Sequence, residues 1–152
     1  MKAKIGFLLL ITVIIANSCN KDKFTTRPQL ILKSVNATRL VSGQALIFTF
    51  DFTQKSGTLD TLYIKRSSLM CDSTTYINNY NYHIPSFTEV NNQTGQITVS
   101  FAYNTSITGA VNISNGTCNV QADTSIFKFC LGDKEGHFSD TIKSGKITFI
   151  KQ

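Results

Sequence analysis

"ALIFTFDF", residues 45–52, is the stretch that decides the fold. Hydrophobic side chains stand at every second position: Leu46, Phe48, Phe50 and Phe52. Successive side chains of a β-strand point to opposite faces, so this pattern predicts a strand with one face in a hydrophobic core.

Two later stretches repeat the alternation. In residues 96–103 and 125–131 the hydrophobic positions are Ile97, Val99, Phe101, Tyr103, Phe127, Phe129 and Leu131. Weaker patterns predict strands over residues 29–35, 59–64, 108–113 and 141–150. Turn-prone residues, often with glycine, separate these segments. Seven short strands without helical periodicity predict an all-β protein, an antiparallel β-sandwich of about seven strands, with a small barrel or jelly roll as the alternative.

The N-terminus has the layout of a secretory signal. Lys2 and Lys4 precede apolar residues 5–16, a stretch shorter than the roughly 20 residues that span a bilayer. Residues 16–19, Ala-Asn-Ser-Cys, resemble the lipobox of bacterial lipoproteins. The resemblance implies a signal peptide over residues 1–18 and lipidation of Cys19. The alternative is cleavage by ordinary signal peptidase, which leaves a secreted protein with a free N-terminal thiol.

Removing the signal peptide leaves one domain of ordinary size on a short polar segment. Residues 19–28 carry no apolar periodicity and predict a lipidated tether, and residues 29–152 form the β-sandwich domain. The lipid would hold the domain on the bacterial cell envelope, and the outer membrane is the expected location. Two or more acyl chains are needed for stable anchoring.

Three segments resemble the immunoglobulin-like lipoproteins of Bacteroidota. They are "PQLILKSVNATRLVSGQALIFTFDFTQKSGTL" (28–59), "YNYHIPSF" (80–87) and "IFKFCLGDKEGHFSDTI" (126–142). The resemblance implies an immunoglobulin-like sandwich but brings no known activity. The chain has no Trp, so its core must depend on its 11 Phe and 5 Tyr residues instead of the buried Trp of antibody domains.

The net charge is modestly positive. It is +6 for the whole chain, and it falls to +4 when residues 1–18 remove two of the 15 basic residues and none of the nine acidic ones. The basic residues are scattered, and Lys65-Arg66 is the only adjacent pair after residue 18. We therefore expect a solvated surface and no nucleic-acid partner.

Three cysteines remain if Cys19 is acylated. Cys71, Cys118 and Cys130 allow one disulfide with three alternative pairings in an oxidising envelope. We favour Cys71 with Cys118, because Cys130 lies inside a predicted strand. No Cys-x-x-Cys spacing occurs, so a metal role for the thiols is not expected.

The sequence offers little for catalysis. His83 and His137 have no partner at metal-binding spacing, and no Gly-x-Ser-x-Gly elbow occurs. Asp133, Glu135 and Asp140 lie near the last predicted turn and would bind Ca²⁺ only if Asp51, Asp60 or Asp72 came close. We therefore interpret these three as solvated turn residues. We expect no enzyme activity, metal or cofactor.

Residues 71–87 are the most promising surface. This segment, predicted to be a long polar loop, places Tyr76, Tyr80 and Tyr82 among asparagines and next to His83. Aromatic rings beside amides suit glycans or peptide loops. The alternative is that the tyrosines cap the edge of the sandwich.

Taken together, the residues favour a lipid-anchored, non-enzymatic binding or accessory module of the envelope. Its partners would be the membrane, through the N-terminal lipid, and a glycan or envelope protein. The alternatives are a structural or assembly lipoprotein of an outer-membrane complex that binds through a sheet edge, or a small hydrolase or protease inhibitor.

Overall fold

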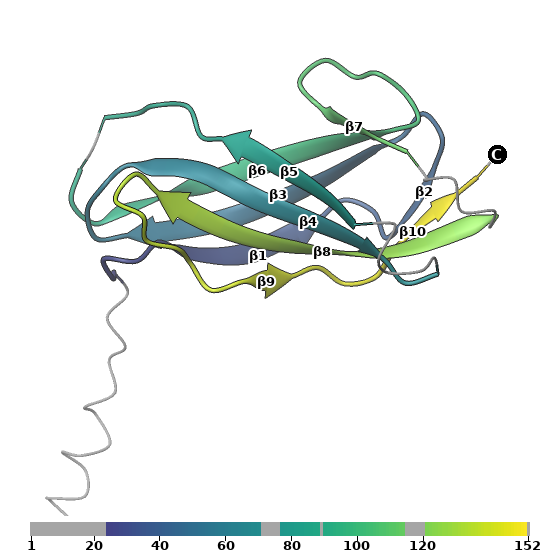
Figure 1. Cartoon of the computed structure of the whole chain (residues 1–152). Helices are drawn as coiled ribbons and strands as arrows, with labels where there is room; N and C mark the ends of the chain where they lie inside the picture. The colour runs from purple at the N-terminus through teal and green to yellow at the C-terminus, as the bar shows by residue number, and fades with distance from the viewer. Residues whose placement is uncertain (1–23, 71–76, 89, 115–120, 152) are drawn as a thin grey trace, which may run out of the picture.

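The computed structural model describes residues 24–70, 77–88, 90–114 and 121–151, and all regular elements in this part of the chain are β-strands. They form two sheets stacked in two layers (Figure 1). One sheet has the strand order β1-β3-β6-β7, and the other has the order β2-β10-β8-β4-β5 with β9 paired to β8. The prediction of an all-β protein with two packed sheets is therefore confirmed.

The strands are β1 (Gln29–Val35), β2 (Arg39–Val41), β3 (Ala45–Gln54), β4 (Leu59–Ser68), β5 (Ile77–His83), β6 (Gln93–Tyr103), β7 (Val111–Ile113), β8 (Ala122–Asp133), β9 (Ile142–Lys143) and β10 (Ile147–Ile150). The bounds predicted for β1 agree with the structure. The strongly alternating strands are longer than predicted: β3 by two residues at its C-terminal end, β6 by three at its N-terminal end, and β8 by three at its N-terminal and two at its C-terminal end.

Phenylalanine rings join the two sheets. Phe48 of β3 is fully buried, and its ring centroid lies 5.1 Å from that of Phe127 and 4.9 Å from that of Phe129, both on β8. Phe101 of β6 also contacts Phe127, at 5.4 Å. These rings come from the alternating positions that defined the strands in sequence. The core is therefore a product of the same two-residue period that forms the sheets.

The sheets are not purely antiparallel, which corrects the prediction. β10 runs parallel to β2, and β6 runs parallel to β7. The described residues also form ten strands instead of about seven. Alternation within a strand identifies the face that is buried, but it does not identify the neighbouring strand or its direction, so the sequence pattern could not reveal these pairs.

The structure differs from the predicted elements in three other places. Residues 77–83, assigned to a polar loop, are strand β5, which pairs antiparallel with β4. The strand predicted over residues 141–150 is divided into β9 and β10, between which the Ser144 hydroxyl accepts the backbone N–H of Phe127. β2 was not predicted, because three residues are too few to show a period.

Candidate binding groove

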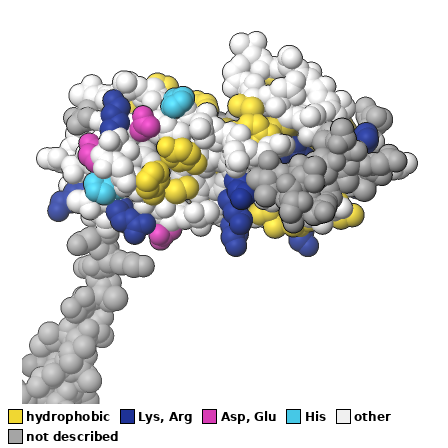
Figure 2. All heavy atoms as spheres, viewed as in Figure 1, with side chains coloured by type: hydrophobic (Ala, Val, Ile, Leu, Met, Phe, Trp, Pro, Cys, Tyr) yellow, Lys and Arg dark blue, Asp and Glu magenta, His cyan; other side chains and the backbone are white. Residues whose placement is uncertain are grey.

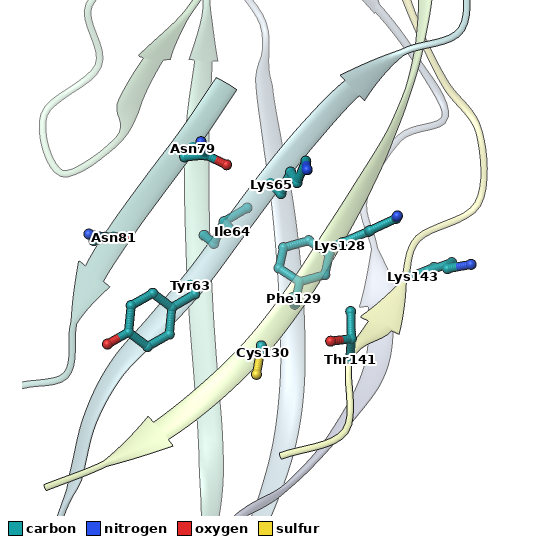
Figure 3. Close-up of a pocket in the computed structure, with 10 residues that line it drawn as sticks. All are labelled: Tyr63, Ile64, Lys65, Asn79, Asn81, Lys128, Phe129, Cys130, Thr141 and Lys143. Atoms are coloured by element: carbon teal, nitrogen blue, oxygen red, sulfur yellow. The ribbon is translucent and has the colours of Figure 1, made fainter. Parts of the chain in front are cut away.

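The outer face of the larger sheet is hollowed into an open groove of about 720 Å³ (Figure 3). The groove crosses four strands, β5, β4, β8 and β9. Most of its side chains belong to the alternate positions that point away from the core. The lining residues are Tyr63, Ile64, Lys65, Asn79, Asn81, Lys128, Phe129, Cys130, Thr141 and Lys143.

Strand pairing places three lysines in one row across this groove. Lys65 of β4 lies opposite Lys128 of β8, and Lys128 lies opposite Lys143 of β9. Neighbouring strands are about 4.8 Å apart, so the three side chains begin within roughly 10 Å of one another. Like charges directly opposite each other destabilise a sheet. The row can be followed in Figure 3, and it has no evident role in holding the fold together.

The described acidic residues do not neutralise the lysine row. Four ion pairs occur among the residues that the structure describes: Arg27–Asp140, Lys33–Asp51, Arg66–Asp123 and His137–Asp133. None of them includes a lysine of the row, and none of the ten groove-lining residues is acidic. Figure 2 shows basic and hydrophobic side chains next to each other on this side of the molecule, which also carries acidic side chains. The groove itself, with three lysines and no acidic lining residue, suits an anionic ligand.

A second row in the groove is polar and aromatic. Tyr63 of β4 lies opposite Asn81 of β5 on one side and Cys130 of β8 on the other. The Tyr63 side chain is 40% exposed, and its ring centroid lies 5.9 Å from that of Phe138. The Cys130 thiol donates to the backbone carbonyl of Ser139 at 3.4 Å. The groove therefore combines an open aromatic ring and an amide with the lysine row.

Two of the tyrosines predicted to form a contact surface point toward the core and not into the groove. Tyr80 and Tyr82 lie in the core-facing phase of β5, are half-buried and pack against the core. The ring of Tyr80 meets Phe101 edge-on at 5.4 Å. Burial raises the pKa of Tyr80 above its ordinary value of 10.0, and the nearby positive charge of Arg66 offsets part of the increase. These two rings therefore act as edge caps of the sandwich, which was the alternative, while Asn79 and Asn81 face the groove.

The other predicted contact residues do not join the tyrosines. His83 is exposed at the end of β5, where its Nδ1 lies 3.1 Å from the Thr61 hydroxyl. Tyr76 lies outside the described residues, as do the predicted lipidation site Cys19 and the predicted disulfide partners Cys71 and Cys118. Cys130 is a free thiol.

The hairpin after β8 brings together one cluster that could hold a cation. Oxygen and nitrogen atoms of Asp133, Glu135 and His137 lie within 4.8 Å of one another. Asp133 is buried, and its carboxylate already accepts the Gln54 amide at 3.0 Å and the backbone N–H of His137 at 2.7 Å. These bonds fix the turn, so the cluster has a structural role without any ion.

Asp140 of the last turn and Asp51, one of the residues named to complete a calcium site, form ion pairs elsewhere. Asp140 pairs with Arg27 at 3.3 Å, and Asp51 pairs with Lys33 at 3.5 Å on the other sheet. Glu135 and Asp140 are exposed, as predicted, whereas Asp133 is buried at the end of β8, so its interpretation as a solvated turn residue was wrong.

The structure also contains a buried ion pair that the sequence analysis missed. Arg66 is 3% exposed and lies between the sheets, where its Nη2 is 2.9 Å from the Asp123 carboxylate. Its Nε donates to the Ser125 hydroxyl at 3.0 Å, and its guanidinium lies 4.3 Å from the centre of the Phe149 ring. The sequence did contain a signal for this burial. Arg66 lies two residues after Ile64 and four after Leu62, so it occupies the same core-facing positions of the strand.

No helix in the described part of the chain has the length and hydrophobicity that crossing a membrane requires. No protein-family model and no curated protein matches the sequence.

Two solved structures are similar to this chain at a low level. One is the sporulation control protein Spo0M from Bacillus subtilis, with a TM-score of 0.47 and 9% identity over 84% of this chain and 51% of that chain. The other is the ApaA protein from Bordetella pertussis, with a TM-score of 0.32 and 7% identity over 82% of this chain and 91% of that chain. This chain spans about half the length of the Spo0M chain. Similarity of this degree carries no argument about function.

Proposed function

We propose that the protein is a lipid-anchored, non-enzymatic binding module of the bacterial envelope, with an immunoglobulin-like sandwich as its scaffold. Acyl chains on Cys19 hold it on the membrane, and residues 19–28 separate the domain from the bilayer. The groove over β5, β4, β8 and β9 is its contact face.

The observation that carries this proposal is the composition of the groove. Ammonium, amide, phenol and hydroxyl groups from four strands converge on one open surface of about 720 Å³. A concave site with a few convergent polar groups is typical of ligand binding. We therefore propose the groove as a surface for ligand recognition.

The anchor is tested by changing Cys19→Ala in the full chain and fractionating the cells. We expect the wild type in the membrane fraction with a mass shift from the acyl groups on its N-terminal peptide, and the variant outside that fraction. Cys130→Ala is the matched control and should leave the protein on the membrane. An unmodified thiol on the N-terminal peptide of the wild type would contradict the anchoring.

The contact face is tested in living cells with a photo-crosslinking amino acid. We expect an envelope component to be captured when it replaces Asn81 in the groove. The matched control is Thr98, which is exposed on the outer face of the other sheet, on β6. Equal capture at both positions, or capture at Thr98 alone, would mean that the groove is not the contact face.

A second candidate is an assembly lipoprotein that binds a partner through a sheet edge. β5 ends the strand order of the larger sheet, and its seven residues offer backbone groups on the open side. Such a partner would be retained when the groove lysines are replaced. The groove proposal requires the opposite result.

A further inference from the structure

We propose that the groove binds an acidic polysaccharide, whose anionic groups pair with the row of Lys65, Lys128 and Lys143. This inference rests on the proposed function, because it names the ligand class of the same contact face.

The register of the strands places like charges opposite one another. Lys128 faces a lysine on both sides, in strands β4 and β9. In such a row the like charges directly across the strands weaken the pairing of the strands, unless an anion lies among them. Because the row extends across the strands, it matches a chain that carries one anionic group after another.

Neutral hydrogen-bonding groups lie beside the lysine row. Asn79 lies opposite Lys65, and Asn81 lies opposite Tyr63, so the edge of the groove on β5 carries two amides. Thr141 contributes a hydroxyl near β9. Amides donate and accept hydrogen bonds at once, which matches sugar hydroxyls. The exposed ring of Tyr63 offers a flat face for a sugar ring.

The composition of the groove also disfavours nucleic acid as the anionic partner. Single-stranded nucleic acids are held by several stacking rings along a basic channel, whereas Tyr63 is the only residue with an exposed ring among the ten that line the groove.

The test uses the full chain in detergent micelles and measures binding by microscale thermophoresis at low salt. Polygalacturonate, dextran sulfate and neutral dextran are the probes. We expect saturable binding of at least one of the acidic polymers, weakened by added NaCl, and no binding of neutral dextran. Polygalacturonate and dextran sulfate separate a carboxylated from a sulfated natural ligand, and either result supports the proposal.

Variants locate the binding in the groove. Lys128→Gln should weaken binding by on the order of ten-fold, because it removes one charge-assisted contact at a partly screened site. Replacement of all three lysines by Gln should abolish it. Lys55→Gln is the matched control, since Lys55 is exposed in the turn between β3 and β4 and its replacement changes the net charge equally. Unchanged thermal unfolding shows that the variants fold.

Several outcomes would overturn the inference. These are equal binding by the triple variant, equal weakening by Lys55→Gln, and tighter binding of phosphatidylglycerol vesicles or single-stranded DNA than of either acidic polymer. Its failure is distinguishable from failure of the proposed function. If the crosslinker at Asn81 still captures an envelope component while both acidic polymers fail to bind, the face is correct and the ligand class is wrong.

Discussion

Lys65 and Arg66 are neighbours on one strand and carry the same charge, yet their surroundings are opposite. Arg66 points into the core, where Asp123, Ser125 and the ring of Phe149 surround its guanidinium. Lys65 points into the groove, and its partner across the strands is another lysine. A buried charge must be compensated within the fold, whereas an exposed row of like charges is tolerated by solvent. The compensated charge therefore reports on stability, and the uncompensated row reports on function.

The largest expected effect comes from breaking the buried ion pair between Arg66 and Asp123. Asp123→Asn keeps the shape of the side chain but leaves the Arg66 guanidinium without its counter-charge. Removing one partner of a buried pair costs about 3–5 kcal/mol of unfolding free energy. Because Asn keeps one acceptor, we expect about 3 kcal/mol. Urea unfolding of the full chain measures this loss.

Two further variants determine whether burial explains this cost. Asp51→Asn breaks the Lys33–Asp51 pair, whose side chains are 50% and 44% exposed, and we expect a loss below about 1 kcal/mol. Combining Arg66→Met with Asp123→Leu removes both buried charges and should be less costly than Asp123→Asn alone. If the double variant is clearly less stable than the single one, the hydrogen bonds of the network, and not the charge pair, dominate.

A smaller effect of opposite sign is expected in the groove. Lys128→Glu converts a row of three like charges into alternating charges. Opposite charges directly across strands stabilise a sheet, so the variant should gain about 0.5 kcal/mol of unfolding free energy at low ionic strength. The gain should vanish at high salt, because the groove is exposed. The same substitution should abolish binding of acidic polysaccharide.

The control for this prediction is Lys128→Gln. It removes the repulsion without adding attraction, and its unfolding free energy at low salt should lie between those of the wild type and Lys128→Glu. Equal stability of all three proteins at low salt would show that the lysine row is not under electrostatic strain, and the functional argument from its register would then be lost.

The comparison also shows which features the sequence could predict. Strong alternation, as in β3, identified the core-facing residues because a single strand contains the whole pattern. The lysine row could not be recognised, since Lys65, Lys128 and Lys143 come from strands that meet only through pairing. Basic residues that are scattered along the sequence are thus adjacent in space.

The prediction for the tyrosine-rich segment was wrong for a related reason. In β5 the core-facing residues Tyr80 and Tyr82 alternate with asparagines, which are common in turns, so composition favoured a loop over a strand. For Arg66 the prediction was wrong in the opposite sense, because a buried residue was expected at the surface. A basic residue next to a lysine was assigned to the surface, although its phase on β4 placed it with Leu62 and Ile64.

The smallest expected effect is on the pH dependence of stability, to which Tyr80 contributes next to the buried charge of Arg66. Burial raises the pKa of Tyr80 above 10.0, and the charge of Arg66 opposes this increase. Below about pH 10 Tyr80 is protonated in both states, so its contribution to stability is fully present; it is lost as the pH rises from the unfolded pKa through the folded one. We therefore expect the urea midpoint of Tyr80→Phe to fall less between about pH 9 and 11 than that of the wild type. The Arg66→Met/Asp123→Leu double variant lacks the opposing charge. In that background the difference in urea-midpoint fall between the protein with Tyr80 and its Tyr80→Phe variant should grow. A difference that shrinks would mean that Arg66 does not act on Tyr80.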